Sequence, residues 1–213
     1  MLTIWGRKTS SNVQAVMWAV GELGLEHVRH DAGHTYGVVD SVAFYTLNPN
    51  RTVPVIEDDG IAPLWETGAI LRYLGRRYGQ GTLWPVDMVE QAEVDKWADW
   101  AKLNVAMNFT VPVFWRAVRT APDQQDTDAI AVALATLEDK LAIAETQLTK
   151  QRYLASGTLT LADIQLGHVL YRYFDIDIPR PNLPALEAYF ERLTERPAFR
   201  EHVMVSYDEL RVT

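Results

Sequence analysis

The chain contains no cysteine among its 213 residues. Disulfide bonds, thiolate metal sites and a protein-thiol nucleophile are therefore excluded. Any sulfur chemistry has to arrive with a ligand. The His, Asp and Glu residues show neither an HExxH motif nor another paired ligand spacing, and no glycine-rich phosphate loop is present. We expect no metal site and no nucleotide site.

Positive charge and long apolar runs are also scarce. The 20 Lys and Arg residues are outnumbered by 28 Asp and Glu residues, which gives a formal net charge of -8. This balance disfavours binding to the phosphate backbone of nucleic acid. No apolar run reaches the roughly 20 residues that a spanning helix needs, and the N-terminus lacks a signal-peptide pattern. We expect a soluble, cytoplasmic protein that binds neither nucleic acid nor membrane.

The first part of the chain, residues 1–79, has the pattern of a small mixed α/β unit. Strand-like runs at 2–5 and 27–31 flank a helical period that begins at Val13 and stops at Gly24. A weak helical stretch covers 40–46. The β-branched run 53–56 turns through Asp58-Asp59-Gly60 into a second strand at 61–64. A helix from Glu66 to Gly79 completes the order β-α-β-α-β-β-α.

The remainder, residues 86–213, shows only helical patterns and is predicted to be a separate all-helical domain. Pro112 interrupts the first helical stretch and is expected to kink it, because proline lacks the amide hydrogen that an inner turn requires. Pro184 and Pro197 instead suit the first turns of two helices. The expected helices cover residues 87–118, 126–149, 160–174, 184–194 and 198–205.

Three short constellations in the first part carry hydrogen-bonding groups that a ligand can use. Thr9-Ser10-Ser11-Asn12 precedes the first helix; it is either an ordinary N-cap or, with its surplus donors at a positive helix end, a holder for an anion such as a thiolate. Val53-Pro54 fits an edge strand, or main-chain pairing with an extended peptide. Glu66-Thr67 fits a helix cap, or an amino-acid head group held by hydroxyl, amides and carboxylate.

The order and spacing of several strings resemble bacterial glutathione transferases. GRKTSSNVQAVMWAVGELGL, LNPNRTVPVIEDDG and LWETGAILRYLGRRYG look like the family's thioredoxin-like glutathione-binding domain. TLTLADIQLGHVLYRY and LPALEAYFERLTERPAFREHV look like its helical domain. The similarity covers nearly the whole chain. It implies a cytosolic glutathione S-transferase of the Ser/Asn type, with glutathione as co-substrate, a small electrophile as second substrate, a role in detoxification and a homodimeric state.

The resemblance also assigns site residues. It implies a cis bond at Pro54, pairing of Val53 with the cysteinyl backbone of glutathione, and Glu66 and Thr67 at its γ-glutamyl end. Ser10 matches the hydroxyl of the serine-type enzymes and Asn12 the amide of some bacterial relatives, so both remain candidates for the thiolate contact.

The chain also departs from the family pattern, because Thr52 stands where relatives often have lysine. Arg51 or His34 is therefore expected to meet the glycine carboxylate. Asp99 resembles a position that in dimeric relatives reaches the partner's γ-glutamyl amine, although a solvated helical Asp is the simpler interpretation.

Two further groups have both a structural and a functional interpretation. Thr160 and Asp163 form a capping box, and the resemblance implies a folding role rather than a catalytic one. Apolar side chains on the first long helix fit an acceptor pocket beside the thiol, but an aromatic stripe is more often core. The pocket candidates are Phe109, Val111, Phe114 and Trp115.

Two rival functions remain compatible with these residues. One is a glutathione-dependent disulfide reductase, peroxidase or dehalogenase on the same fold. The other is a non-catalytic glutathione transferase-like binding protein, whose expected mark is a degraded glutathione site. The retention of Val53, Pro54, Glu66 and Thr67 argues against the second.

Overall fold

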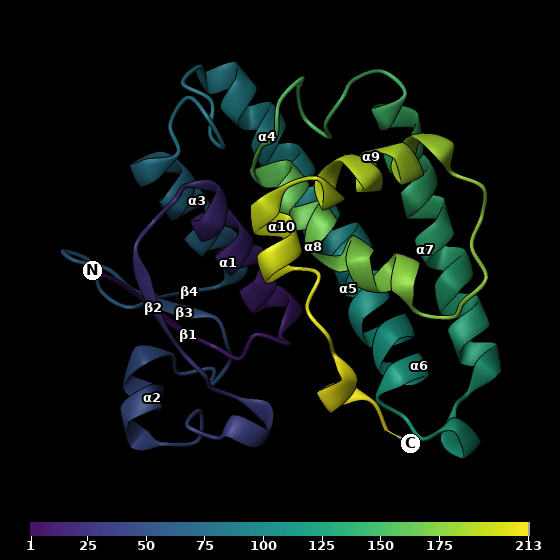
Figure 1. The fold of residues 1–213 in the computed structure, drawn as a ribbon, viewed down its shortest axis with the longest axis horizontal. Coiled ribbons are helices and arrows are strands. Elements are labelled where there is room, and N and C mark those ends of the chain that lie inside the picture. Colours follow the sequence, from purple (N-terminus) through teal and green to yellow (C-terminus); the bar gives the residue numbers. More distant parts are fainter. Residues whose placement is uncertain (213) are drawn as a thin grey trace.

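The computed structural model describes residues 1–212, and its first part is the predicted mixed α/β unit. The order β-α-β-α-β-β-α is confirmed, with a short 3-10 turn at His34–Tyr36 before α2. Figure 1 shows this part beside a larger group of helices. Its elements are β1 (Leu2–Trp5), α1 (Ser11–Glu22), β2 (His27–His30), α2 (Val42–Leu47), β3 (Val55–Glu57), β4 (Leu64–Trp65) and α3 (Thr67–Tyr78).

The four strands form one mixed sheet in the order β2-β1-β3-β4. β1 and β2 are parallel, whereas β1–β3 and β3–β4 are antiparallel. β3 begins at Val55 rather than at Val53 as predicted, because Pro54 has no amide hydrogen to donate to a ladder. The sheet is thus shorter than the sequence pattern, and Val53 lies outside it.

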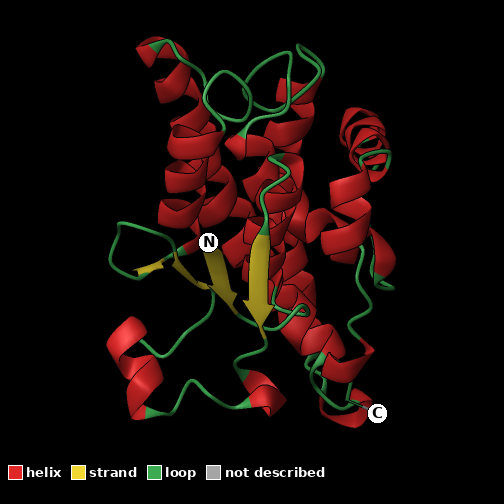
Figure 2. Ribbon diagram, turned by 60° about the vertical axis from the view of Figure 1, so that its left-hand side comes forward, coloured by secondary structure: helices red, strands yellow, loops and turns green. Residues whose placement is uncertain are grey.

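Alternate side chains of the strands face two different layers. Ile4 and Ile56 belong to the large core that includes α1 and α3, and both are fully buried. Val55 belongs to a small second core with Phe44 of α2, against which Trp5 packs. Figures 1 and 2 show α2 on the side of the sheet away from α1 and α3.

The regular elements of the second part, residues 86–212, are all helices, as predicted. The expected long helix spans 88–118, and Pro184 and Pro197 occupy the first positions of their helices. The helices are α4 (Met88–Trp100), α5 (Met107–Phe109), α6 (Arg116–Val118), α7 (Thr127–Leu148), α8 (Leu161–Asp175), α9 (Pro184–Thr194) and α10 (Pro197–His202), with 3-10 turns at Pro122–Gln124 and Asp208–Leu210.

Two π-helical turns connect α4, α5 and α6 into one rod. They cover Ala101–Ala106 and Thr110–Trp115. Pro112 lies in the second, so the expected interruption takes the form of a wider turn, which accommodates the missing hydrogen bond. The first has no proline. π-helical turns inside α-helices are frequent at functional sites, which directs attention to residues 101–106.

The large core runs across both parts of the chain. α1 packs against α3 of its own part and against α8 and α10 of the helical part. Trp18 of α1 is fully buried, and a Cβ atom at Gly167 of α8 would lie only 2.8 Å from its ring. Glycine at this position therefore lets the two helices approach closely. α1 is consequently held from both sides.

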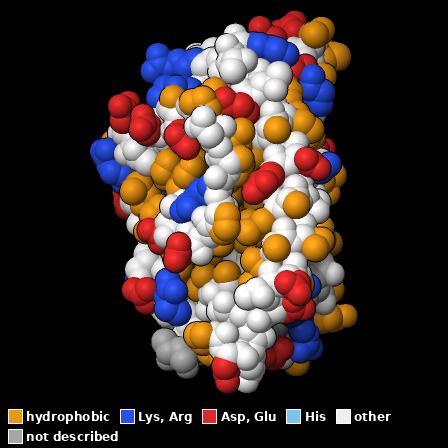
Figure 3. Space-filling model, turned by 90° about the vertical axis from the view of Figure 1, so that its right-hand side faces the viewer, with side chains coloured by type: hydrophobic (Ala, Val, Ile, Leu, Met, Phe, Trp, Pro, Cys, Tyr) orange, Lys and Arg blue, Asp and Glu red, His pale blue; other side chains and the backbone are white. Residues whose placement is uncertain are grey.

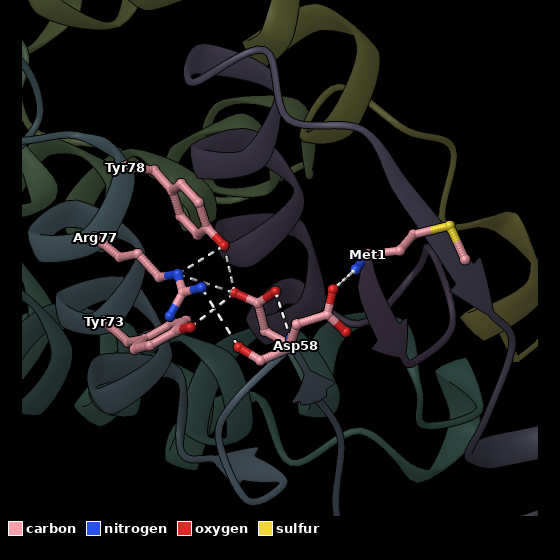
Figure 4. Close-up of polar contacts among 6 residues, drawn as sticks. Met1, Asp58, Tyr73, Arg77 and Tyr78 are labelled. Carbon is pink, nitrogen blue, oxygen red and sulfur yellow. Dashed lines mark hydrogen bonds and ion pairs between the residues drawn. The ribbon is translucent and has the colours of Figure 1, made fainter.

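The side chain of Asp58 joins the β3–β4 turn to α3 (Figure 4). Its Oδ2 atom accepts hydrogen bonds from Tyr73 at 2.7 Å and from Tyr78 at 2.5 Å, and its Oδ1 atom accepts one from the Asp59 amide. Arg77 lies 3.6 Å away. Burial raises the pKa of Asp58, but the hydrogen bonds from Tyr78 and Tyr73 outweigh it and hold the pKa below its usual 3.8.

We expect Asp58→Asn to lower the free energy of unfolding at pH 7 by about 1–3 kcal/mol. The asparagine amide has only one oxygen, so it cannot accept hydrogen bonds both from the two tyrosines and from the Asp59 amide. The contribution of a carboxylate with a lowered folded pKa is present above its unfolded pKa and disappears as the pH falls through the folded one. Urea titrations should therefore show the gap between wild type and variant shrinking below pH 3.8. Asp59→Asn is the exposed control, and an equal loss there would contradict this account.

Among residues 1–212, no helix is both long and apolar enough to cross a membrane. On the face that carries α7, hydrophobic side chains alternate with acidic and basic ones (Figure 3). Val132, which is 69% exposed, belongs to α7.

Candidate functional site

The first turn of α1 presents hydrogen-bond donors that the helix itself does not use. Ser10 is the N-cap residue, but its side chain makes no capping hydrogen bond. Its carbonyl accepts the first intrahelical bond, from the Gln14 amide at 2.9 Å. The amides of the first turn therefore have no partner within the helix, and they lie at its positive end. A hydroxyl and several amides are available here to an anion.

Asn12, in the same turn, is held by a lysine from the helical part. The Nζ atom of Lys102 donates a hydrogen bond to Asn12 Oδ1 at 2.6 Å. Lys102 lies in the π-helical turn Ala101–Ala106. Burial lowers its pKa, and the nearby charge of Glu66 acts in the opposite direction. The sequence pattern does not distinguish Lys102 from a solvated helical lysine, so this residue was not predicted.

Glu66 has an unusual backbone conformation at the start of α3. It is the N-cap residue, with φ of 71° and ψ of 117°, and its exposed side chain makes no capping hydrogen bond. A positive φ at a non-glycine residue costs free energy and occurs often at functional sites. Thr67 follows and is 4% exposed. The carboxylate of Glu66 is therefore exposed to solvent and does not cap the helix.

The Val53–Pro54 peptide bond is cis, as the resemblance implied. The amide and carbonyl of Val53 have no hydrogen-bond partner within residues 1–212. A Cβ atom at Gly6 would lie 3.3 Å from Val53 Cβ and 2.4 Å from a methyl group of Val13, so only glycine fits beside them. The free main chain of Val53 is thus brought next to the first turn of α1.

We call the surface formed by Ser10, Asn12, Val53, Glu66 and Lys102 the α1 site. It combines four segments of the chain, three from the α/β part and one from the helical part. It offers hydroxyl and amide donors, an unpaired strand-like main chain, a carboxylate and an ammonium. Such a set fits an extended peptide that carries both charged ends and an acidic thiol.

Two predicted binding residues are engaged elsewhere. Arg51 donates to the Asp40 carbonyl at 3.1 Å and lies over the Tyr45 ring, beside α2. Asp99 of α4 forms an ion pair with Arg72 of α3 at 2.5 Å, which joins the helical part to the α/β part. Arg72 in turn reaches the first turn of α3, where a Cβ atom at Gly68 would lie 3.2 Å from its guanidinium. The roles suggested for Arg51 and Asp99 stay predictions.

His34 lies near several charged residues rather than near Glu66. Burial lowers its pKa, and the charges of Arg7 and Arg119 lower it further. It is connected to the α1 site only through its neighbour Gly33, where a Cβ atom would lie 3.6 Å from a Val53 methyl group. Its proposed contact with a glycine carboxylate stays a prediction.

The aromatic residues predicted to line an acceptor pocket divide into two groups. Phe109 and Phe114 are 1% and 0% exposed and belong to the core, so they do not line an open pocket here. The helix turns both rings inward, and the pocket role expected for them stays a prediction. Trp115 and Val111 are 42% and 51% exposed. Only these two remain available to a second substrate.

The larger cavities lie away from the α1 site. Two hollows of about 840 and 710 Å³ share the loop residues Gly81, Thr82, Gly157 and Thr158. Neither is lined by a residue of the α1 site. The chemistry of its side chains, and not the volume of a cavity, therefore marks the α1 site as the candidate binding site. Within residues 1–212, no three His, Asp or Glu side chains gather as a metal site.

Asp163 has the predicted capping role. Its carboxylate is fully buried and accepts hydrogen bonds from the amides of Leu154 and Thr160, both at 2.8 Å, and from the Tyr189 hydroxyl at 3.0 Å. Burial raises its pKa to about 6, and these hydrogen bonds oppose the shift. All its capacity is used inside the helical part.

Two family profiles match the chain. One is described as "Glutathione S-transferase, N-terminal domain" and matches residues 9–77. The other is described as "Glutathione S-transferase, C-terminal domain" and matches residues 104–197. The first includes most of the α1 site, and the second includes the two exposed candidates for the second substrate.

Individual proteins are similar over nearly the whole chain. Glutathione S-transferase GstB from Escherichia coli K12 is 34% identical over 209 residues, covering 96% of this chain and 99% of that protein. A theta class glutathione S-transferase from Xanthomonas axonopodis pv. citri, solved with glutathione bound, is 39% identical with a TM-score of 0.91 and covers 96% and 98% of the two chains. A probable elongation factor 1-gamma 2 from Arabidopsis thaliana is 28% identical, covering 82% of this chain but 42% of that protein.

Proposed function

Because the chain belongs to the glutathione S-transferase family, we propose that its α1 site binds glutathione and that the enzyme conjugates the glutathione thiolate to small electrophiles. The observation that carries this proposal is the convergence of Asn12, Glu66 and Lys102 beside the open first turn of α1. The hydrogen-bond donors and the ammonium suit the thiolate of glutathione, and the carboxylate of Glu66 suits its γ-glutamyl ammonium.

The contact between Asn12 and Lys102 supports Asn12 as the donor to the sulfur. An ammonium has three donors and no acceptor, so the Asn12 oxygen has to face Lys102. The amide NH₂ group then points away from Lys102 and is available to a thiolate. The charge of Lys102 and the positive end of α1 favour the anionic form of the thiol. Ser10 supplies a second hydroxyl at the same helix end.

The two ends of the tripeptide have different partners. The γ-glutamyl carboxylate accepts from the Thr67 hydroxyl and the first amides of α3, and its ammonium pairs with Glu66. The cysteinyl main chain pairs with the free amide and carbonyl of Val53. The cysteinyl sulfur then lies toward the first turn of α1, between the two.

The reaction needs no covalent link to the protein. The thiol proton leaves to solvent, the sulfur forms a bond to the electrophilic carbon, and the leaving group departs with its bonding electron pair. Holding the thiolate beside its acceptor converts a bimolecular step into an effectively unimolecular one. Because the chain has no cysteine, a mixed disulfide with the protein is not available as an intermediate.

Glutathione binding tests the proposal directly. We expect Glu66→Gln to weaken glutathione binding by roughly 10- to 100-fold in calorimetry, since a charge-assisted hydrogen bond to the γ-glutamyl ammonium is lost. Glu26→Gln, an exposed change of the same kind on the loop before β2, should bind like wild type. Wild-type protein that gives no heat of association at millimolar glutathione would overturn the proposal.

The activity itself distinguishes the remaining functions. Conjugation should exceed glutathione-dependent reduction of disulfides and peroxides in parallel assays. A protein that binds glutathione but turns over none of these substrates would instead be a non-catalytic binding protein. A homodimer is part of the same proposal, and sedimentation velocity measures it.

A further inference from the structure

Three arginines meet next to the α1 site, one from each of three segments. Arg7 lies in the β1–α1 loop, Arg119 follows α6, and Arg172 is on α8. Burial lowers the pKa of Arg7, and the charge of Arg119 lowers it further. Burial also lowers the pKa of Arg172 to about 10; Tyr207 opposes this shift, and Arg7 and Arg119 reinforce it. The Arg172 guanidinium lies 4.7 Å from the ring of Phe114, the residue before the Trp115 whose ring Arg119 covers. We call these three guanidinium groups, whose charges act on one another, the arginine cluster.

The arginine cluster has no ion-pair partner among residues 1–212 within 4.0 Å. Arg172 is 3% exposed and donates to the Thr9 carbonyl at 2.6 Å, while its Nε atom has no hydrogen-bond partner. The Nε atom of Arg7 is likewise buried without a partner. Arg172 is thus a buried cation without an ion-pair partner, and Arg7 and Arg119 add two partly exposed positive charges, so this arrangement favours an added anion.

Glu209 is the nearby carboxylate, but its oxygens are used by other groups. One accepts a hydrogen bond from the Thr9 hydroxyl and the other from the Tyr36 hydroxyl at 3.2 Å. Its charge raises the pKa of Arg7 without forming an ion pair. Glu209 therefore forms no ion pair with any of the three guanidinium groups.

Two members of the arginine cluster contact the backbone of Thr9 and Ser10, at the start of α1. The Arg7 carbonyl accepts from the Ser10 amide at 3.1 Å, and Arg172 holds the carbonyl of Thr9, the next residue before Ser10. Arg119 lies 4.3 Å from the ring of Trp115, which is 42% exposed. A flat aromatic surface and a guanidinium are thus presented together.

We propose that the arginine cluster binds the carboxylate of the second substrate, so that the preferred electrophiles are small carboxylic acids, planar ones above all. This inference rests on the proposed function. The planar guanidinium fork matches a carboxylate in two parallel hydrogen bonds, and the Trp115 ring stacks on a planar acceptor. The acceptor's reactive carbon is then held on the side of the sulfur that faces the helical part.

A matched pair of aryl chlorides tests this. With 4-chloro-3-nitrobenzoate, the sulfur bonds to the ring carbon, the C–Cl bond breaks, and chloride leaves with the electron pair. The neutral partner is 4-chloro-3-nitrobenzamide. Each kcat/KM is divided by its uncatalysed rate constant. We expect the acid-to-amide ratio to fall by roughly 10- to 100-fold in Arg119→Gln and in Arg7→Gln, because the acid loses a charge-assisted contact that the amide does not make.

Arg116→Gln is the matched control, because it removes an exposed arginine three residues from Arg119 on α6. Its ratio should equal that of wild type. Equal ratios in all four proteins would overturn the inference. So would a rise in the glutathione Kd of Arg119→Gln, which would assign the arginine cluster to the glycine carboxylate of glutathione.

An unreactive pair separates this inference from the proposed function. Calorimetry compares 3-nitrobenzoate with 3-nitrobenzamide on the same proteins. If neither aryl chloride is turned over, yet nitrobenzoate binds wild type and not Arg119→Gln, the anion site stands and the transferase proposal fails. If turnover occurs and nitrobenzoate binds no better than nitrobenzamide, the transferase proposal stands and the anion site fails.

Discussion

Asn12→Ala is expected to lower kcat for conjugation by about 10²- to 10³-fold, the usual effect of removing one preorganised donor from a developing or stabilised anion. The thiol pKa of bound glutathione should rise in the same variant, because the thiolate loses a hydrogen bond. Ultraviolet difference absorbance of the bound thiolate, followed against pH, measures this shift. Glutathione affinity should change little, since Val53, Glu66 and Thr67 are intact.

Ser10→Ala is the matched comparison on the same helix turn. It removes a hydroxyl that makes no capping bond, so its effect on stability should be small. We expect its turnover to fall by less than roughly tenfold, in keeping with a neutral hydrogen bond. The reverse order, with Ser10→Ala inactive and Asn12→Ala active, would move the thiolate contact to Ser10.

Two substitutions of Lys102 distinguish its two effects, which are the orientation of the Asn12 amide and the positive charge beside the thiolate. Lys102→Gln keeps a donor that can reach the Asn12 oxygen but removes the charge, whereas Lys102→Met removes both. If orientation dominates, Lys102→Gln should retain much more activity than Lys102→Met. If charge dominates, both variants should raise the thiol pKa equally.

Asp163→Ala is expected to lower the free energy of unfolding by about 3–5 kcal/mol, the range for breaking a buried charged network. Two amides and the Tyr189 hydroxyl would lose their acceptor inside the helical part. An unsatisfied buried donor costs more than the lost bond itself. Guanidinium titrations monitored by circular dichroism measure the difference.

The comparison for this prediction is Asp139→Asn on α7, an exposed residue without a described hydrogen bond. It should unfold like wild type. If Asp163→Ala were as stable as this control, the role of Asp163 as acceptor for these three donors would be wrong. A stable but inactive Asp163→Ala protein would indicate that Asp163 affects the reaction, against the structural role assigned to it.

The helix periods in the sequence predicted the fold well because burial follows them directly. Ile70, Leu71, Leu74 and Tyr78 share one face of α3 in the pattern; the first three are buried, whereas Tyr78 at the end of the helix is 39% exposed. The exact ends of the strands were harder to predict. β3 starts two residues later than its β-branched pattern, since Pro54 cannot donate to the ladder.

The site was less accessible to sequence reasoning, because it depends on contacts between distant segments. Glu66 could be singled out by its position before a helix, but its positive φ could not be anticipated. Lys102 contacts Asn12 across 90 residues, and its side chain is directed there by a π-helical turn that leaves no clear composition signal. Phe109 and Phe114 are buried in the core, and the sequence could not show this, since aromatic residues on a long helix suit both a pocket and a core.

The wide turn at Ala101–Ala106 has a consequence for the length of the chain at this point. A π-helical turn holds one residue more than an α-helical turn, so deleting a single residue there would let the rod continue with ordinary spacing. Each residue of an α-helix turns the chain by about 100°, and the deletion would therefore rotate the ammonium away from α1. A deletion of one residue in this segment would thus remove the hydrogen bond from Lys102 to Asn12 that joins the two parts of the molecule.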